Sequence, residues 1–146
     1  MYKVALYLTL ILFFPSCKNE TKCSQLQGPY ANCAGNDITL AYQLIDGKWF
    51  MRRDKDNGLK SPAVCYDEPK STLEFLTDSA VVTNPDGTPW LKHYKLRVDS
   101  LRHQLTLNYD GAIYGFDLTI CENYMRLSLP PYYSGSMSES YEEYSR

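Results

Sequence analysis

The stretch that decides the fold spans residues 104–129 and reads QLTLNYDGAIYGFDLTICENYMRLSL. Apolar and polar residues alternate in three successive runs, at 104–109, 112–120 and 124–129. A period of two is that of a β-strand with one buried face. Asp110-Gly111, between the first two runs, is typical of a tight hairpin turn. The stretch therefore predicts three antiparallel strands in a meander.

The same alternation extends toward the N-terminus and reappears at the C-terminal end. It predicts further strands at residues 49–53, 71–77, 80–83 and 90–98, and a short closing strand at 141–146. Before them, Asn36-Asp37 is expected to cap a short helix. The helix would bury one apolar face, formed by Ile38, Ala41, Leu44 and Ile45.

About eight short strands joined by hairpins are compatible with a sandwich or with a closed barrel. A closed barrel has no free sheet edges, at which chains could associate, and this favours the barrel. The predicted fold class is therefore all-β: a small antiparallel up-and-down β-barrel of about eight strands with a short N-terminal helix, over residues 36–146.

Gly47-Lys48-Trp49 follows the helix and opens the first strand. This resembles the G-x-W motif of lipocalins, and residues 71–75 and 104–111 are similar to segments of bacterial lipocalin-like lipoproteins. The resemblance implies that Trp49 closes one end of the barrel and that a basic residue of the last strand packs over its ring. Arg146 is the candidate for that residue, and Arg126 is the alternative.

An eight-stranded barrel can hold one small ligand inside. Four aromatic residues are expected to point inward and to line an apolar cavity: Trp90, Tyr94, Tyr114 and Phe116. The alternative is that these rings fill the core and leave no cavity. Both outcomes remain open at the level of the sequence.

The first sixteen residues are typical of an export signal. Lys3 precedes an apolar run at 4–14, which is too short to span a bilayer. Phe14-Pro15-Ser16-Cys17 resembles the cleavage box of a bacterial lipoprotein, which implies that Cys17 becomes a lipid-carrying N-terminus. Residues 17–35 would then form a polar tether, and Lys18 in place of Asp points to the outer membrane. The alternative is a cleaved secretory signal, with Cys17 in a disulfide.

Lipidation of Cys17 would leave four cysteines, and an even number in an oxidising compartment suggests two disulfides. Their spacing does not fit a zinc site. We favour Cys23–Cys33 with Cys65–Cys121, although a barrel places loop 54–70 and turn 121–123 at opposite ends. Cys121 could instead pair with Cys23 or Cys33 beside the helix, and free thiols are the remaining alternative.

Composition and motifs exclude several classes of function. The formal net charge of −2 provides no dense basic face for nucleic acid. There is no G-x-S-x-G motif, only two histidines occur, and the adjacent pairs Asp67-Glu68 and Glu142-Glu143 would point to opposite faces of a strand. We therefore expect no enzyme, no metal and no cofactor. The sequence favours a lipid-anchored envelope protein that binds a small apolar ligand; the alternative is a protein-interaction or inhibitor module that uses loop 54–70 or the outer face.

Overall fold

The computed structural model describes residue 23, residue 26 and residues 28–56, 62–129 and 139–146. The expected signal peptide, Cys17 and much of the expected tether lie outside these residues. The described part contains one helix and nine strands: α1 (Ile38–Ile45), β1 (Gly47–Lys55), β2 (Val64–Cys65), β3 (Thr72–Phe75), β4 (Ser79–Thr83), β5 (Pro89–Asp99), β6 (Gln104–Tyr109), β7 (Phe116–Cys121), β8 (Tyr124–Leu129) and β9 (Ser140–Ser145).

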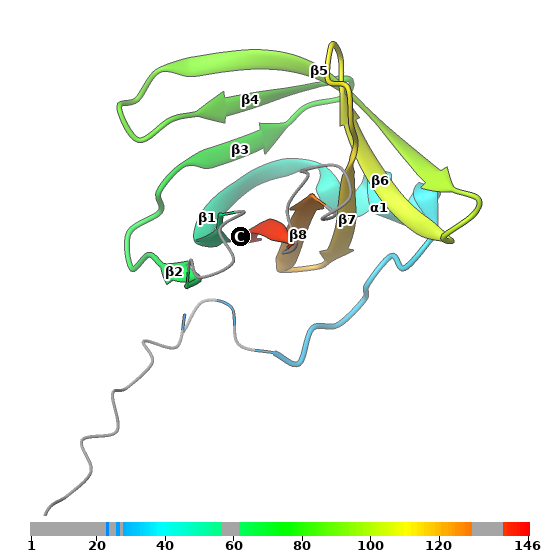
Figure 1. The fold of residues 1–146 in the computed structure, drawn as a ribbon, viewed down its shortest axis with the longest axis horizontal. Helices are drawn as coiled ribbons and strands as arrows, with labels where there is room; N and C mark the ends of the chain where they lie inside the picture. Colours follow the sequence, from blue (N-terminus) through cyan, green and yellow to red (C-terminus); the bar gives the residue numbers. More distant parts are fainter. Residues whose placement is uncertain (1–22, 24–25, 27, 57–61, 130–138) are drawn as a thin grey trace, which may run out of the picture.

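The strands form one antiparallel sheet that curls back on itself (Figure 1). Neighbours in the chain are neighbours in the sheet from β3 to β9, and β1 closes the ring by pairing with both β3 and β9. The short β2 adds to the end of β1, where Cys65 lies opposite Arg53. The predicted closed antiparallel barrel with one short helix is confirmed.

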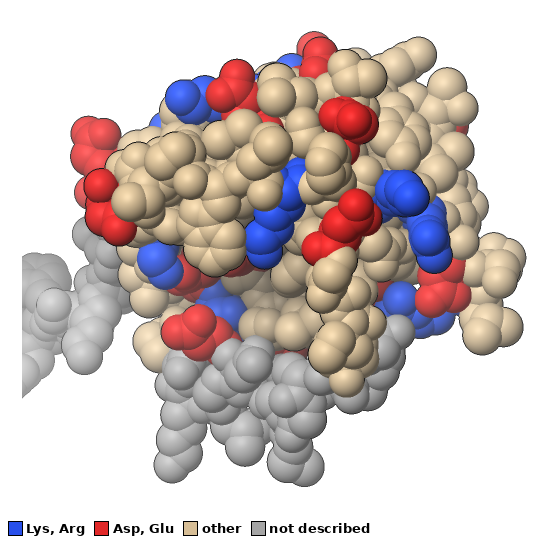
Figure 2. All heavy atoms as spheres, turned by 90° about the horizontal axis from the view of Figure 1, so that it is seen from above, with Lys and Arg blue, Asp and Glu red and all other residues tan. Residues whose placement is uncertain are grey.

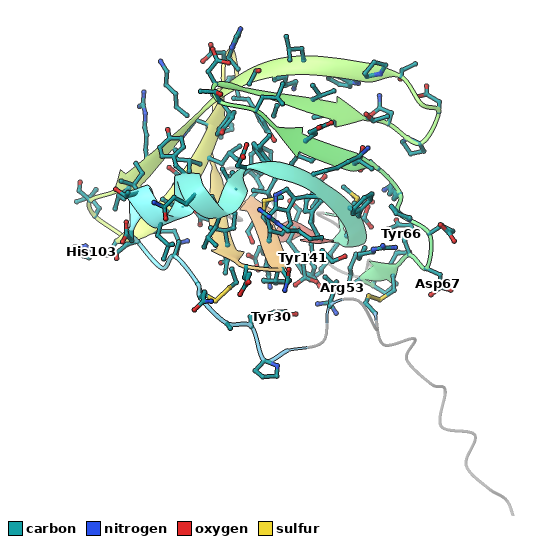
Figure 3. All side chains as sticks on the ribbon, turned by 180° about the vertical axis from the view of Figure 1, so that it is seen from behind. Tyr30, Arg53, Tyr66, Asp67, His103 and Tyr141 are labelled. Atoms are coloured by element: carbon teal, nitrogen blue, oxygen red, sulfur yellow. A yellow bond between two sulfur atoms is a disulfide. The ribbon has the colours of Figure 1, made fainter. Side chains whose placement is uncertain are left out.

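The connections define the two ends of the barrel. At the open end, β1, β4, β6 and β8 end and β3, β5, β7 and β9 begin. At the closed end lie α1 and the turns between β3 and β4, β5 and β6, and β7 and β8. Figure 3 shows this separation, since Tyr66 and Asp67 next to β2 lie far from His103 in the β5–β6 turn.

Helix α1 begins where the sequence predicts. Asp37 is its N-cap, and its Oδ1 accepts hydrogen bonds from the amides of Thr39 at 2.9 Å and Leu40 at 3.0 Å. Two of its own residues, Ala41 and Ile45, are fully buried. The helix contacts β5 and β7, and it covers the closed end of the barrel.

Two predicted strand boundaries were wrong. The strand expected at 112–120 begins only at Phe116, so β6 and β7 pair through just Thr106–Asp117 and Leu107–Phe116. Gly115 lies so close to β6 that a Cβ there would be 2.4 Å from Oδ1 of Asn108. The second concerns the loop expected at 54–70. Strand β1 continues into it as far as Lys55, and the short strand β2 lies within it.

The favoured disulfide pairing was also wrong. The bonds are Cys23–Cys65 and Cys33–Cys121, so the alternative that paired Cys121 with Cys33 is the one observed. We call the described residues of this segment, Cys23, Leu26 and residues 28–34, the N-terminal strap. The strap lies outside the barrel and joins β2 to the end of β7 (Figure 1). Backbone hydrogen bonds hold its end, from Ala34 N to Ile120 O at 2.9 Å and from Glu122 N to Ala31 O at 3.3 Å.

Candidate ligand cavity

The closed end of the barrel is built around Trp49, whose side chain is fully buried. Its Nε1 donates a hydrogen bond to the Ile45 carbonyl at 2.9 Å, which ties the first strand to the end of α1. Gly47 makes the turn between them with a φ of +98°, a conformation that favours glycine. The Arg146 guanidinium lies 4.5 Å from the centre of the Trp49 ring and donates to the Asp46 carbonyl at 2.8 Å.

The structure thus brings Gly47, Trp49 and Arg146 together at this end. Arg126, the alternative to Arg146, lies elsewhere. Its guanidinium is 4.1 Å from the centre of the Tyr141 ring and forms an ion pair with Glu139 at 2.9 Å.

Large side chains fill the barrel above Trp49. The rings of Phe75 and Tyr94 meet edge to face, with centroids 4.9 Å apart. The Tyr94 hydroxyl donates to the Leu76 carbonyl at 3.1 Å, and burial raises the pKa of Tyr94 to about 12. Further buried side chains of the same core cluster come from Leu96, Leu105, Leu118, Ile120 and Met125.

A recess opens into the other half of the barrel interior, which we call the open half. A cavity of about 410 Å³ lies there, within the range of volumes usual for small-molecule sites. Its apolar wall comes from six strands and consists of Met51, Leu73, Val82, Tyr109, Phe116 and Leu127. A second recess of about 470 Å³ adjoins it and shares Phe116, Leu127 and Glu142. The interior is therefore packed at one end and open at the other.

Glu142 is the acidic residue common to both recesses. Its Oε2 accepts a hydrogen bond from the Tyr144 hydroxyl at 2.6 Å, and within the described residues it has no ion-pair partner. Burial raises the pKa of the Glu142 carboxyl, and the nearby charge of Asp54 adds to this effect. Burial likewise raises the pKa of Tyr144. The cavity wall therefore carries a carboxyl group that is easier to protonate than an exposed one.

Two lysines also line the cavity of about 410 Å³. The Lys92 ammonium lies 4.8 Å from the centre of the Trp90 ring and 5.5 Å from that of Tyr109. Lys70 is paired with the carboxylate of Asp54, and this hydrogen bond raises the pKa of Lys70. Both cations are thus satisfied by ring faces or a carboxylate, and they border the apolar part of the wall.

The four aromatic residues predicted to line a cavity lie in different places. Phe116 lines it, whereas Tyr94 is buried in the packed half below it. Trp90 is 50% exposed, because it lies near the start of β5, in a part that pairs only with β4 and not with β6. Tyr114 is also exposed, because it precedes β7 instead of lying within it. Trp90 shares a face with its partner Val82, which lines the cavity, but neither Trp90 nor Tyr114 is itself a lining residue.

Sequence reasoning missed Glu142 and the aliphatic part of the wall. The available signal was the alternation of the last strand, which puts Glu142 on the same face as the buried Tyr144. The adjacent Glu143 points outward, where it is paired with Arg53 and accepts a hydrogen bond from the Tyr124 hydroxyl at 2.7 Å. Tyr30 of the N-terminal strap stacks on Tyr124, with centroids 3.9 Å apart.

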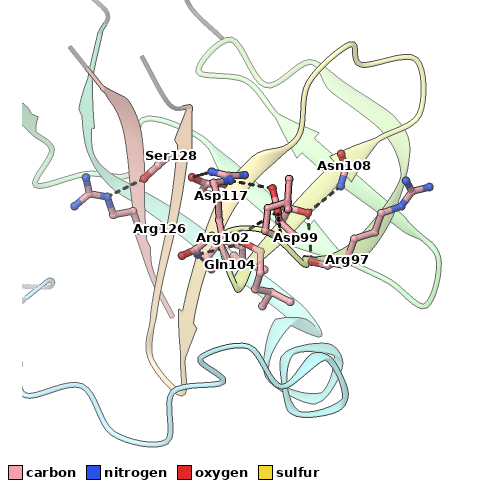
Figure 4. A network of polar contacts seen from close by, with 12 residues as sticks. Arg97, Asp99, Arg102, Gln104, Asn108, Asp117, Arg126 and Ser128 are labelled. Carbon is pink, nitrogen blue, oxygen red and sulfur yellow. Dashed lines mark hydrogen bonds and ion pairs between the residues drawn. The ribbon is translucent and has the colours of Figure 1, made fainter. Parts of the chain in front are cut away.

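A polar network on the outer face joins the closed-end turn to β7 (Figure 4). Arg102 of the β5–β6 turn binds Asp99 at 2.9 Å and Asp117 at 2.8 Å. Because Arg102 is already shared between two carboxylates, we interpret this network as support for the turn. It lies outside the barrel wall and does not contribute to the cavity.

No group of three or more His, Cys, Asp and Glu side chains in the described residues is arranged to hold a metal ion. No helix in the described part of the chain is both long and apolar enough to cross a membrane.

Among solved structures, this chain is similar to one of a crustacyanin apoprotein. It is that of apocrustacyanin C2, which is 19% identical and aligns over 82% of this chain and 76% of its own, with a TM-score of 0.41. No protein-family model matches the chain, and no curated protein matches it significantly. The fold class defined by the strand order and the helix-covered closed end is a lipocalin-like barrel.

Proposed function

We propose that this chain is a lipid-anchored cell-envelope protein whose barrel binds a small, largely apolar ligand. The observation that carries the proposal is the recess in the open half of the barrel, a cavity of about 410 Å³ beside a second recess. A wall of Met51, Leu73, Val82, Phe116 and Leu127 would remove an apolar ligand from water, which is the main favourable term in such binding.

Glu142 and Tyr144 add polarity to this wall at a defined place. A ligand with one hydrogen-bonding group could place that group against the Glu142 carboxyl and its remaining atoms against the aliphatic side chains. A buried polar group favours ligands that satisfy it, since leaving it unpaired costs free energy. We therefore propose an apolar ligand with a single polar group.

The proposed anchor is the acylated Cys17, followed by the segment that leads to Cys23. Support comes from the lipoprotein-like box at residues 14–17 and from two disulfides further along the chain, which are typical of an oxidising compartment. Two or more acyl chains would hold the protein stably on a membrane. Mass spectrometry of the protein purified from membranes tests this part, because acylation at Cys17 adds a defined mass.

Ligand binding is tested with the fluorescent probe N-phenyl-1-naphthylamine. We expect saturable binding to the wild-type protein. Leu127→Trp, which adds volume inside the cavity, should weaken binding by about tenfold or more. Thr119→Trp is the matched control, since Thr119 is an exposed residue of the neighbouring strand β7. Absence of binding by the wild type, or equal binding by both variants, would contradict the proposal.

A further inference from the structure

The N-terminal strap meets the barrel at its open end. Cys23 is bonded to Cys65, with Cα atoms 5.6 Å apart, and Cys65 pairs with Arg53 near the end of β1. From there the strap continues along the outside of the barrel to Cys33, which is bonded to Cys121 beside the β7–β8 turn at the closed end. In Figure 3, Tyr30 of the strap lies below the wall that carries Arg53 and Tyr141.

This arrangement limits how far the open end can lie from Cys17. Six residue steps separate Cys17 from Cys23, which corresponds to about 20 Å for a fully extended chain. Without the Cys23–Cys65 bond, the first covalent attachment to the barrel would be Cys33, at the opposite end. The disulfide therefore decides which end of the barrel lies near the N-terminal residue.

We infer that the Cys23–Cys65 disulfide turns the open end of the barrel toward the bilayer, so that the partner of the cavity mouth is a lipid surface. The inference rests on the proposed acylation of Cys17. It goes further than the proposed function, because it states that the cavity mouth faces the bilayer. An apolar ligand would then pass between the bilayer and the cavity over a short distance.

The side chains around the mouth are compatible with a lipid surface. Four large apolar residues near the strand ends at the open end are 46–86% exposed: Val64, Trp90, Leu91 and Ile113. Trp90 lies beside Lys92, and tryptophan with lysine is a common pair at membrane interfaces. Figure 2 shows one face of the molecule with acidic and basic residues interspersed among wider areas of other residues.

The exposed apolar residues alone do not give the orientation, because Leu101 at the closed end is 92% exposed. The disulfide carries the argument. Leu101 is useful as the control position, since it is, like Ile113 at 86% exposure, a large and highly exposed apolar residue, but it lies at the other end of the barrel.

The test uses the full-length protein, expressed with its leader, purified from membranes and reconstituted into phosphatidylcholine vesicles that contain a headgroup-nitroxide lipid. A bimane fluorophore is attached at Ile113→Cys or Leu101→Cys, and mass spectrometry verifies that both native disulfides and the acyl group are present. We expect the nitroxide to quench the probe at position 113 several-fold more than the probe at position 101. Equal quenching, or stronger quenching at position 101, would overturn the inference.

Two double variants separate the disulfide from other causes. Cys23→Ser with Cys65→Ser should abolish the difference between the two probe positions, because the strap is then attached only at the closed end. Cys33→Ser with Cys121→Ser should preserve it. An unchanged difference in the first variant would overturn the role of the disulfide.

The experiments also distinguish a failure of this inference from a failure of the proposed function. If the wild-type protein does not bind N-phenyl-1-naphthylamine in detergent solution but the quenching difference is present, the ligand cavity is refuted and the orientation stands. A protein without an acyl group on Cys17 would overturn the orientation and the anchor, while binding of the probe would still be measurable.

Discussion

The two halves of the barrel interior have the same strand pattern and different contents. In the closed half, the large side chains of Trp49, Phe75 and Tyr94 are buried, and the rings of Phe75 and Tyr94 meet edge to face. In the open half, the facing positions carry Met51, Leu73, Val82 and Leu127, and a cavity of about 410 Å³ remains. Alternation decides only which side chains point inward. Whether they fill the barrel depends on the volumes of the side chains that face one another at each height along the barrel, and on the helix that covers one end.

The adjacent residues Glu142 and Glu143 show the same contrast at the level of single side chains. Glu143 faces outward and is nonetheless buried, with Arg53 and Tyr124 as partners. Glu142 faces the cavity and has a hydroxyl as its partner. A carboxylate with a cation is stabilised in its charged form, whereas one in an apolar wall is not.

The largest effect is expected at the packed end. Trp49→Ala should lower the free energy of unfolding by about 4 kcal/mol, because it leaves a large void and removes the partner of Arg146. Leu127→Ala, at the cavity wall, should cost about 2 kcal/mol, since it deletes a smaller side chain and the space it leaves joins the existing cavity. Urea denaturation with intact disulfides measures both. Equal losses would show that the two halves are packed alike.

The next effect concerns the outward glutamate. Glu143→Gln should destabilise the protein by about 2 kcal/mol, because it removes the charge that Arg53 and the Tyr124 hydroxyl both engage. Glu139→Gln is the control, since that carboxylate is 43% exposed and its pair with Arg126 should contribute little. Chemical denaturation at pH 7 measures both variants, and similar losses would argue against the importance of burial here.

A smaller effect is expected at the helix that covers the closed end. Asp37→Ala should cost about 1 kcal/mol, because the amides of Thr39 and Leu40 lose their acceptor. Asn36→Ala, one residue earlier, should change stability much less. If removing the cap had no effect on thermal unfolding, α1 would owe its stability to its packing on the barrel and not to its own N-terminus.

The smallest effect is one of pH. The folded protein raises the pKa of Glu142, so it binds a proton more readily than the unfolded chain does. The stabilising contribution is complete below the ordinary pKa of glutamate, at about pH 4, and is lost as the pH rises through the higher pKa of the folded state. Glu142→Gln should therefore gain stability relative to the wild type as the pH increases across this range. Denaturation curves at several pH values test this, and an unchanged difference would contradict it.

Much of the fold follows from local patterns. The alternation over residues 104–129 and the Asp110-Gly111 turn predicted the meander, and Asp37 predicted the start of the helix. The resemblance at Gly47-Lys48-Trp49 pointed to Arg146, and the structure places its guanidinium over that ring. These features depend on neighbours in sequence or on a recurrent motif.

By itself, the sequence determined the order of the strands and the face that each one buries, because the period of two is a property of the extended backbone. Only the tertiary structure decided the disulfide partners, the exposure of Trp90 and Tyr114, and the position of Glu142 in a cavity wall. Each of these depends on which residues distant in the chain meet across the closed sheet, and on where the wall ends. A local pattern contains no information about which distant residues meet or about where the wall ends.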